Sequence, residues 1–289
     1  MTYQPDPSEP TPDHPPAAGR PVHPLERGPM PPPAGSEVVE APPREVRRVL
    51  VPSETPFFTY ALIAINVLVF LADSLTAFAG LGFRGVGLLT LLGAKNNQAI
   101  MAGQTWRLIT PLFLHGGILH LGFNSYFLYV VGRQIESAYG RARFLALYFL
   151  SGLAASIASF TLTNANSVGA SGALFGLIGA WIPLLYRNQH ILANTRQHIR
   201  SIVQVIAINL LIGLAPGIDN WAHLGGLIGG VTLGWFITPR YVLHGYYADE
   251  VHISDDSSPL AVWLATLAIG LGLVGLAVLL ISTGLEGLL

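Results

Sequence analysis

One serine and a few histidines in apolar surroundings are the residues of this sequence best suited to chemistry. Ser171 lies in Gly169-Ala170-Ser171-Gly172, and a serine hydroxyl becomes a useful nucleophile when a base accepts its proton. The flanking glycines let the backbone turn tightly and let a substrate carbonyl come close. Ser171 could then begin a helix, where free backbone N–H groups stabilise an oxyanion. Small residues around a serine also occur at plain helix contacts, so this motif alone leaves both interpretations open.

His223 is a candidate base for that serine. It is followed by Gly226 and Gly230, a G-x-x-x-G face that lets another helix approach closely. The segment after Ser171 offers a matching row of small residues at Gly172, Gly176 and Gly179. Two helices that touch through glycines could bring the serine and the imidazole within hydrogen-bond reach. A lone histidine in an apolar segment can also be purely structural.

His120 and Asn124 are four residues apart, so they share one helix face. Both side chains can donate hydrogen bonds, as the lining of an oxyanion hole requires. A metal site is the alternative, because His115, His120 and His223 could supply three imidazoles. The sequence has no H-E-x-x-H motif and no carboxylate beside these histidines, so we expect no metal and no cofactor.

The composition indicates that membrane helices position these residues. The chain has 289 residues, of which 51% are hydrophobic and 11% are charged, against about 25% charged in a soluble domain. It has no cysteine, which excludes disulfides, thiol catalysis and zinc–thiolate sites. The net charge of −1 gives no reason to expect a nucleic-acid partner.

Seven apolar runs approach the roughly 20 residues that a helix needs to cross a bilayer. The predicted spans are 57–79, 114–135, 142–162, 169–186, 201–217, 219–237 and 260–283. We therefore expect an all-α polytopic membrane protein.

The segments before and between these runs are not expected to cross the membrane. Residues 1–54 contain most of the 21 prolines, and we expect them to form a disordered cytoplasmic tail. The stretch 80–113 is too interrupted by polar residues to span, and it could lie in the membrane interface. We expect 55–240 to form the main membrane domain, 241–259 a cytoplasmic linker and 260–289 an additional C-terminal helix.

Basic residues predict the orientation of the spans. If seven helices alternate, ten arginines fall on one side: Arg44, Arg47, Arg48, Arg133, Arg141, Arg143, Arg187, Arg196, Arg200 and Arg240. The positive-inside rule then places the N-terminus in the cytoplasm and the C-terminus outside. The second, fourth and sixth spans all begin at the outer face, so their polar clusters share one shallow depth. The topology thus predicts a single site.

With these residues assembled, the sequence resembles the rhomboid family of intramembrane serine proteases from about Thr55 to Pro239. The similar motifs follow one another on successive spans. They are Trp106-Arg107, His120-x-x-x-Asn124, Glu136-x-x-x-Gly140, Gly169-x-Ser171-Gly172 and Ala222-His223-x-x-Gly226-x-x-x-Gly230. The extra span after the six-helix bundle resembles the six-plus-one form of the family.

The resemblance implies a dyad in which Ser171 attacks a peptide carbonyl and His223 carries the proton, without an acidic third member. It implies an oxyanion hole of His120, Asn124 and the Ser171 N–H, with Gly169 and Phe175 lining the site. Many relatives have Tyr at the position of Phe175, so a phenol hydrogen bond is missing here. The resemblance also implies structural roles for three further residues, which are Trp106, Arg107 and Glu136.

By the same resemblance, the substrates are single-span proteins cut in or near a bilayer, for which a bacterial-type cell membrane is our expectation. The sequence does not indicate an oligomeric state. Two other classes remain open. One is an inactive rhomboid relative that binds membrane helices without cutting them. The other is a transporter, which would carry paired charges deep in its spans or inverted repeats; we find neither in the sequence.

Overall fold

The computed structural model describes residues 55–245 and 252–285. Contacts divide the chain into residues 1–47 and 48–289, and every described residue lies in the second unit. The predicted tail at 1–54 thus lies outside the described residues. The described part is mainly helical, as the sequence predicted. In chain order its elements are α1 (Phe57–Phe78), α2 (Leu88–Gly93), α3 (Asn97–Met101), η2 (Thr105–Leu108), η3 (Thr110–Phe113), α4 (Ile118–Phe127), η4 (Leu128–Gly132), α5 (Arg133–Tyr139), α6 (Arg141–Leu162), α7 (Ser171–Arg187), α8 (Thr195–Ile212), α9 (Asn220–Ile237), β1 (Tyr241–His244), β2 (His252–Asp255) and α10 (Pro259–Thr283).

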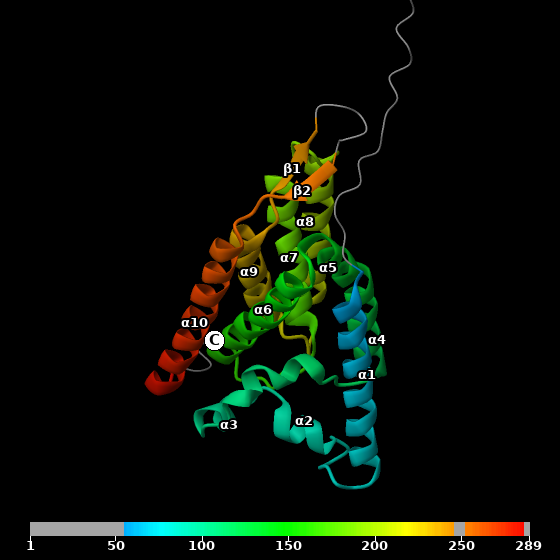
Figure 1. Cartoon of the computed structure of the whole chain (residues 1–289). Coiled ribbons are helices and arrows are strands. Elements are labelled where there is room, and N and C mark those ends of the chain that lie inside the picture. Colours follow the sequence, from blue (N-terminus) through cyan, green and yellow to red (C-terminus); the bar gives the residue numbers. More distant parts are fainter. Residues whose placement is uncertain (1–54, 246–251, 286–289) are drawn as a thin grey trace, which may run out of the picture. The chain divides into compact units, whose positions relative to one another are not determined.

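Helices α6, α7 and α9 form the centre and pack against one another more extensively than any other helices (Figure 1). Glycines make the α7–α9 contact close. A Cβ added to Gly226 would overlap the carbonyl of Gly172, and one added to Gly230 would overlap the carbonyl of Gly176. Such backbone-to-backbone packing maximises van der Waals contact where lipid supplies little hydrophobic driving force.

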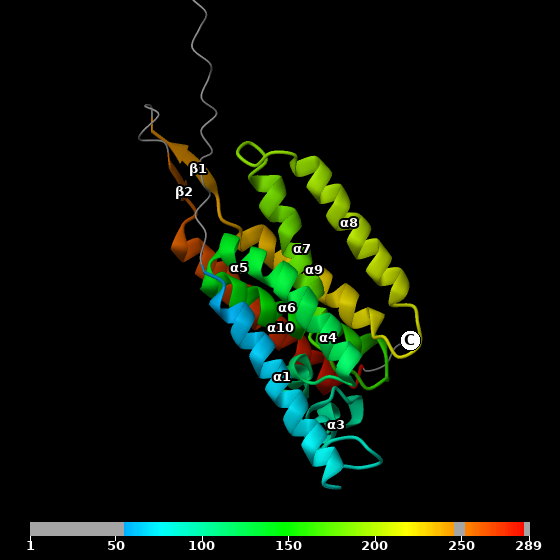
Figure 2. The same cartoon turned by 90° about the vertical axis from the view of Figure 1, so that its right-hand side faces the viewer.

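Helices α1 and α4 flank this centre side by side, as Figures 1 and 2 both show. The first turn of α1 is held by Glu136 of α5. Its carboxylate accepts hydrogen bonds from the N–H groups of Phe58 and Thr59 at 2.7 Å and from the Thr59 hydroxyl at 2.7 Å. Glu136 is fully buried, and the three bonds offset the cost of burying its charge. The two backbone bonds also cap free N–H groups of the helix.

The second predicted span has different limits from those expected. The helix begins at Ile118 instead of residue 114, passes through the π-helical turn η4, and ends at Tyr139 instead of residue 135. Leu114 continues the apolar run in sequence, but it lies in extended backbone before Gly116-Gly117. His115 therefore precedes the helix that carries His120.

The stretch 80–113 forms four short helices, α2, α3, η2 and η3. Arg107 connects η2 to α2, because its guanidinium donates to the carbonyls of Leu91 and Ala94 at 2.8 Å and to the Gln104 side chain at 2.7 Å. Trp106 donates from its indole to the Leu92 carbonyl at 3.0 Å. Both side chains thus stabilise loop backbone.

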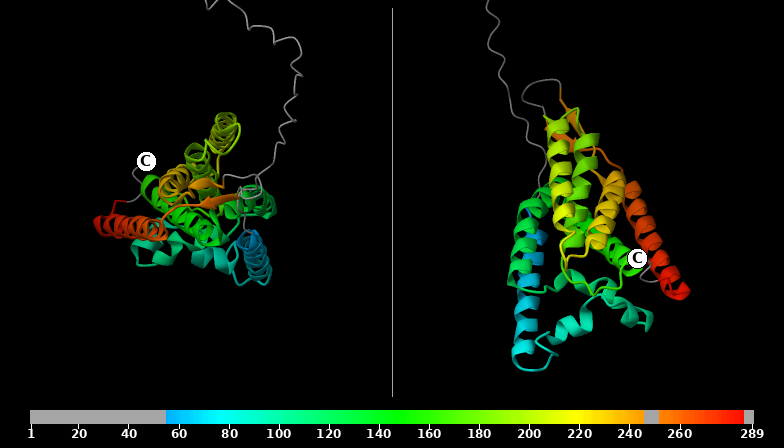
Figure 3. Two further views of the ribbon diagram at one scale, coloured as in Figure 1. Left: turned by 45° about the horizontal axis from the view of Figure 1, so that its top comes forward. Right: turned by 180° about the vertical axis from the view of Figure 1, so that it is seen from behind.

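The predicted linker at 241–259 contains an antiparallel hairpin, in which Tyr241 pairs with Asp255 and His244 with His252. The hairpin joins α9 to α10, and α10 packs against α6 and α9 at the edge of the described part (Figure 3). Of the described helices, three are long and apolar enough to cross a membrane by length and composition: α1, α6 and α10. The expected total of seven spans stays a prediction.

Candidate active site

Ser171 and His223 meet between α7 and α9, although 52 residues separate them in the chain. The Nε2 atom of His223 lies 2.9 Å from the Ser171 hydroxyl oxygen. Ser171 is the first residue of α7, and His223 lies in the first turn of α9. The two helices approach closely through the glycines described above, so the contact is set by backbone packing. This geometry allows the imidazole to accept the serine proton.

Phe175, one turn after the serine, stacks on the imidazole. The two ring centroids are 4.3 Å apart and the planes differ by 14°. His223 is buried, and its Nδ1 atom has no hydrogen-bond partner among the described residues. The ring is therefore oriented by the stack on Phe175 and by the bond to Ser171.

Gly169, two residues before Ser171, lies against the ring of His120. Its φ of +129° is a conformation that side chains disfavour, and a Cβ there would lie 2.7 Å from both Cε1 and Nε2 of His120. The Nδ1 atom of His120 accepts the Gly116 N–H at 3.4 Å. A neutral ring then carries its proton on Nε2, one of the two ring atoms nearest to Gly169. His120 can therefore donate a hydrogen bond beside Gly169, two residues before Ser171.

Asn124 is buried on the same face of α4, one turn after His120. Its amide donates to the His120 carbonyl at 2.9 Å, so this bond uses one of two amide hydrogens. The second hydrogen is the one that could serve an oxyanion.

His115 is buried and lies edge-on to His120, with ring centroids 5.2 Å apart. Neither of its ring nitrogens has a hydrogen-bond partner among the described residues. Within the same residues there is no group of three or more His, Asp or Glu side chains that could hold a metal ion.

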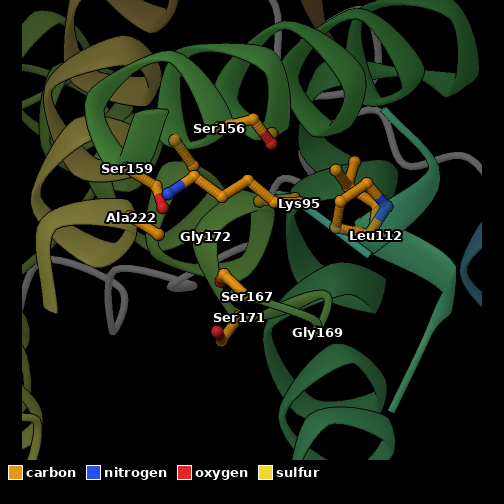
Figure 4. Close-up of a pocket in the computed structure, with 13 residues that line it drawn as sticks. Lys95, Leu112, Ser156, Ser159, Ser167, Gly169, Ser171, Gly172 and Ala222 are labelled. Carbon is orange, nitrogen blue, oxygen red and sulfur yellow. The ribbon is translucent and has the colours of Figure 1, made fainter. Parts of the chain in front are cut away.

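A small cavity with about 20 Å³ of space for water lies behind the serine (Figure 4). One water needs at least about 10–15 Å³ by this measure, so the cavity has room for about one. Lys95 and four serines supply its polar lining, and the serines are Ser156, Ser159, Ser167 and Ser171. The cavity therefore gives the partly buried Ser171 a polar neighbourhood.

Asp219 is a residue of this region that the sequence analysis missed. One carboxylate oxygen accepts the Ala222 N–H at 2.9 Å and caps α9, while the other accepts the Ser159 hydroxyl at 2.5 Å. It therefore links the end of α6 to the turn that carries His223. Its signal in the sequence was an N-cap pattern, in which an Asp stands three residues before the Ala-His pair at the start of an apolar helix.

The chain is similar to known rhomboid proteins. The Rhomboid domain family matches residues 102–240. Rhomboid protease GluP of Bacillus subtilis is 40% identical over 188 residues, which cover 65% of this chain and 36% of that protein. RHOMBOID-like protein 5 of Arabidopsis thaliana is 39% identical over 171 residues, covering 55% of each chain. RHOMBOID-like protein 1 of the same plant is 37% identical over 217 residues, covering 70% of this chain and 56% of the relative. The chain thus spans between about a third and somewhat more than half of the length of these relatives.

Proposed function

The chain belongs to the rhomboid family, and we propose that it is an intramembrane serine endopeptidase with Ser171 as nucleophile and His223 as base. The observation that carries this proposal is the 2.9 Å contact between His223 Nε2 and the Ser171 hydroxyl. The name of the relative GluP, a rhomboid protease, supports the same activity.

In the proposed mechanism, Ser171 attacks a peptide carbonyl while His223 takes the hydroxyl proton, and the imidazolium then gives this proton to the leaving amine. Water hydrolyses the acyl-enzyme in a second step that uses the same base. The oxyanion accepts hydrogen bonds from His120 Nε2–H, from Asn124 and from the Ser171 N–H at the start of α7. Each such donor contributes about 3–4 kcal/mol to the transition state.

The proposed substrates are single-span membrane proteins that are cut in or near their membrane segment. The enzyme needs no cofactor in this mechanism, because the dyad and the oxyanion donors come from the chain itself. We further propose a bacterial-type cell membrane as its location, with the active site towards the outer face.

A relative that binds membrane helices without cutting them is the second candidate. The Arabidopsis relatives are named RHOMBOID-like, which states no activity. The formed Ser171–His223 hydrogen bond favours the protease.

Cleavage of a single-span test protein in liposomes tests the proposal. We would compare the wild type with Ser171→Ala and His223→Ala, and expect each variant to lose at least about 1,000-fold in kcat. A fluorophosphonate probe, which reacts with activated serines, should label the wild type and leave Ser171→Ala unlabelled. Equal cleavage by all three proteins would contradict the dyad. Binding of the test protein without cleavage or labelling would favour the non-cleaving relative.

A further inference from the structure

Lys95 is a buried charged residue that the proposed mechanism does not use. Its side chain is 1% exposed, and a buried ammonium is costly unless hydrogen bonds replace its water. The Nζ atom donates to the Thr163 carbonyl at 2.7 Å and to the Ala165 carbonyl at 3.1 Å. Hydrogen bonds from a charged donor are stronger than neutral ones, so Lys95 holds these carbonyls firmly.

Both carbonyls belong to the segment 163–170, which runs from the end of α6 to the nucleophile. The backbone of Lys95 holds the same segment: its N–H donates to the Ser167 carbonyl at 2.9 Å and its carbonyl accepts the Ser167 N–H at 3.2 Å. The end of the segment is fixed in turn, because the Gly169 N–H donates to the Pro111 carbonyl at 2.9 Å.

The position of this segment decides the geometry of the active site. Gly169 must lie against His120, and the next two peptide groups present the N–H groups at the start of α7. The Lys95 side chain also lines the cavity behind Ser171, where Figure 4 shows it extended towards Ser159. A segment that shifted by about 1 Å would cost about 100-fold in rate while the substrate could still bind.

We propose that Lys95 is a positioning residue for the proposed protease: its ammonium fastens the segment 163–170 so that Gly169 and Ser171 stay in register with His120 and His223. This inference rests on the proposed function. In this proposal Lys95 acts through the carbonyls of Thr163 and Ala165.

Lys95→Met removes the ammonium and keeps a stem of similar length. We expect kcat for the test protein in liposomes to fall about 10- to 100-fold, with KM within about twofold of wild type. The matched control is Asn166→Ala, which removes an exposed hydrogen bond of 2.9 Å between Asn96 and Asn166 that joins the same two segments. This control should keep kcat within about twofold. A kcat of Lys95→Met within twofold of wild type would overturn the proposal.

A second experiment separates positioning from loss of folding. Lys95 and Ser167 form an antiparallel bridge, so Asn96 and Asn166 lie beside it, at a spacing suited to a disulfide. The chain has no other cysteine. In Asn96→Cys/Asn166→Cys, oxidation should leave kcat unchanged when Lys95 is present. In the triple variant Lys95→Met/Asn96→Cys/Asn166→Cys, oxidation should restore most of the lost kcat, and reduction should lower kcat again.

If the oxidised triple variant stays as slow as the reduced one, Lys95 does not act by fastening the segment and the proposal fails. Fluorophosphonate labelling distinguishes this failure from that of the function itself. If the wild type neither cleaves the test protein nor becomes labelled, the protease proposal fails, and the proposed role of Lys95 fails with it. If the wild type is labelled and active but oxidation does not restore the activity of the Lys95→Met variant, only the proposed role of Lys95 fails.

Discussion

Gly169 shows how much of this site depends on a single missing side chain. Its positive φ turns the chain into α7, and the space where a Cβ would stand is occupied by the His120 ring. The proposed oxyanion donor can therefore pack against the segment that leads to Ser171 because residue 169 is a glycine. A larger residue would have to displace the imidazole, the backbone, or both.

Gly169→Ala should lower kcat about 100-fold or more, the effect of losing one oxyanion donor, with a smaller change in KM. The measurement is cleavage of the test protein together with the rate of fluorophosphonate labelling. Gly122→Ala on α4 is the matched control, because a Cβ there has nothing within 4 Å. Equal losses in both variants would contradict the role of Gly169.

At the scale of residues, the topology of the spans predicted that Ser171, His120 and His223 form one site. The structure places His223 at the Ser171 hydroxyl and His120 against Gly169. The sequence could not predict the tautomer of His120, which depends on the Gly116 N–H that its Nδ1 accepts. Lys95 was also missed as a functional candidate. In sequence it only interrupts an apolar stretch, and its carbonyl partners lie about 70 residues further along the chain.

At the scale of elements, the contact between α7 and α9 positions the two residues of the proposed dyad. Gly226 and Gly230 face the backbone carbonyls of Gly172 and Gly176. Any added methyl must push the helices apart, because a carbonyl oxygen of a helix cannot move aside as a flexible side chain does. The distance between Ser171 and His223 would increase with it.

Gly230→Ala should therefore lower both stability and activity. Overpacking typically costs about 1–3 kcal/mol, which we expect to measure as a lower thermal midpoint in detergent and as slower cleavage. Gly275→Ala on α10, where a Cβ meets nothing within 4 Å, should match the wild type. An unchanged midpoint for Gly230→Ala would show that the helices separate at little cost.

The elements were predicted less well at their ends than at their centres. The apolar run containing Leu114 made the second span begin too early, because hydropathy does not reveal the extended backbone before Gly117. The hairpin was missed altogether. Its strands, Tyr241–His244 and His252–Asp255, have four residues each, too few for a periodic pattern.

At the scale of the whole molecule, the hairpin connects distant parts of the described chain. Arg143 at the start of α6 forms an ion pair of 2.8 Å with Asp255 of β2. Burial by itself raises the pKa of Asp255, but hydrogen bonds from Ser257 and Arg240 and the charge of Arg143 outweigh it and hold this pKa below its usual value. The charged carboxylate therefore stabilises the attachment of the hairpin to α6.

The lowered pKa of Asp255 predicts that the stability of the protein depends on pH. Because the folded pKa lies below the unfolded one, the stabilisation is complete above about pH 4 and is lost as pH falls through the folded pKa. Wild type should thus unfold at a higher temperature than Asp255→Asn at pH 6, and the difference should shrink towards pH 3. A difference that stays constant with pH would rule out the carboxylate charge as its cause.

The orientation in the membrane can be tested because the chain lacks cysteine. Gln98→Cys, in α3, should react with an impermeant maleimide added to intact cells. Asp256→Cys, directly after β2, should react only after the cells are opened. Labelling of both from outside would contradict the predicted topology. Each site is at a described, solvent-accessible position.

The glycine contacts also constrain how this sequence can vary. Every single-base change that replaces a glycine introduces a Cβ, so no one-step mutation preserves the contacts of Gly169, Gly226 and Gly230. In a library of all single substitutions, these positions should tolerate almost nothing, whereas Gly272 and Gly275 on α10 have open space and should accept small residues. The map of tolerated mutations would therefore mark the contact of α7 with α9 at Gly226 and Gly230, and the contact of Gly169 with His120 of α4.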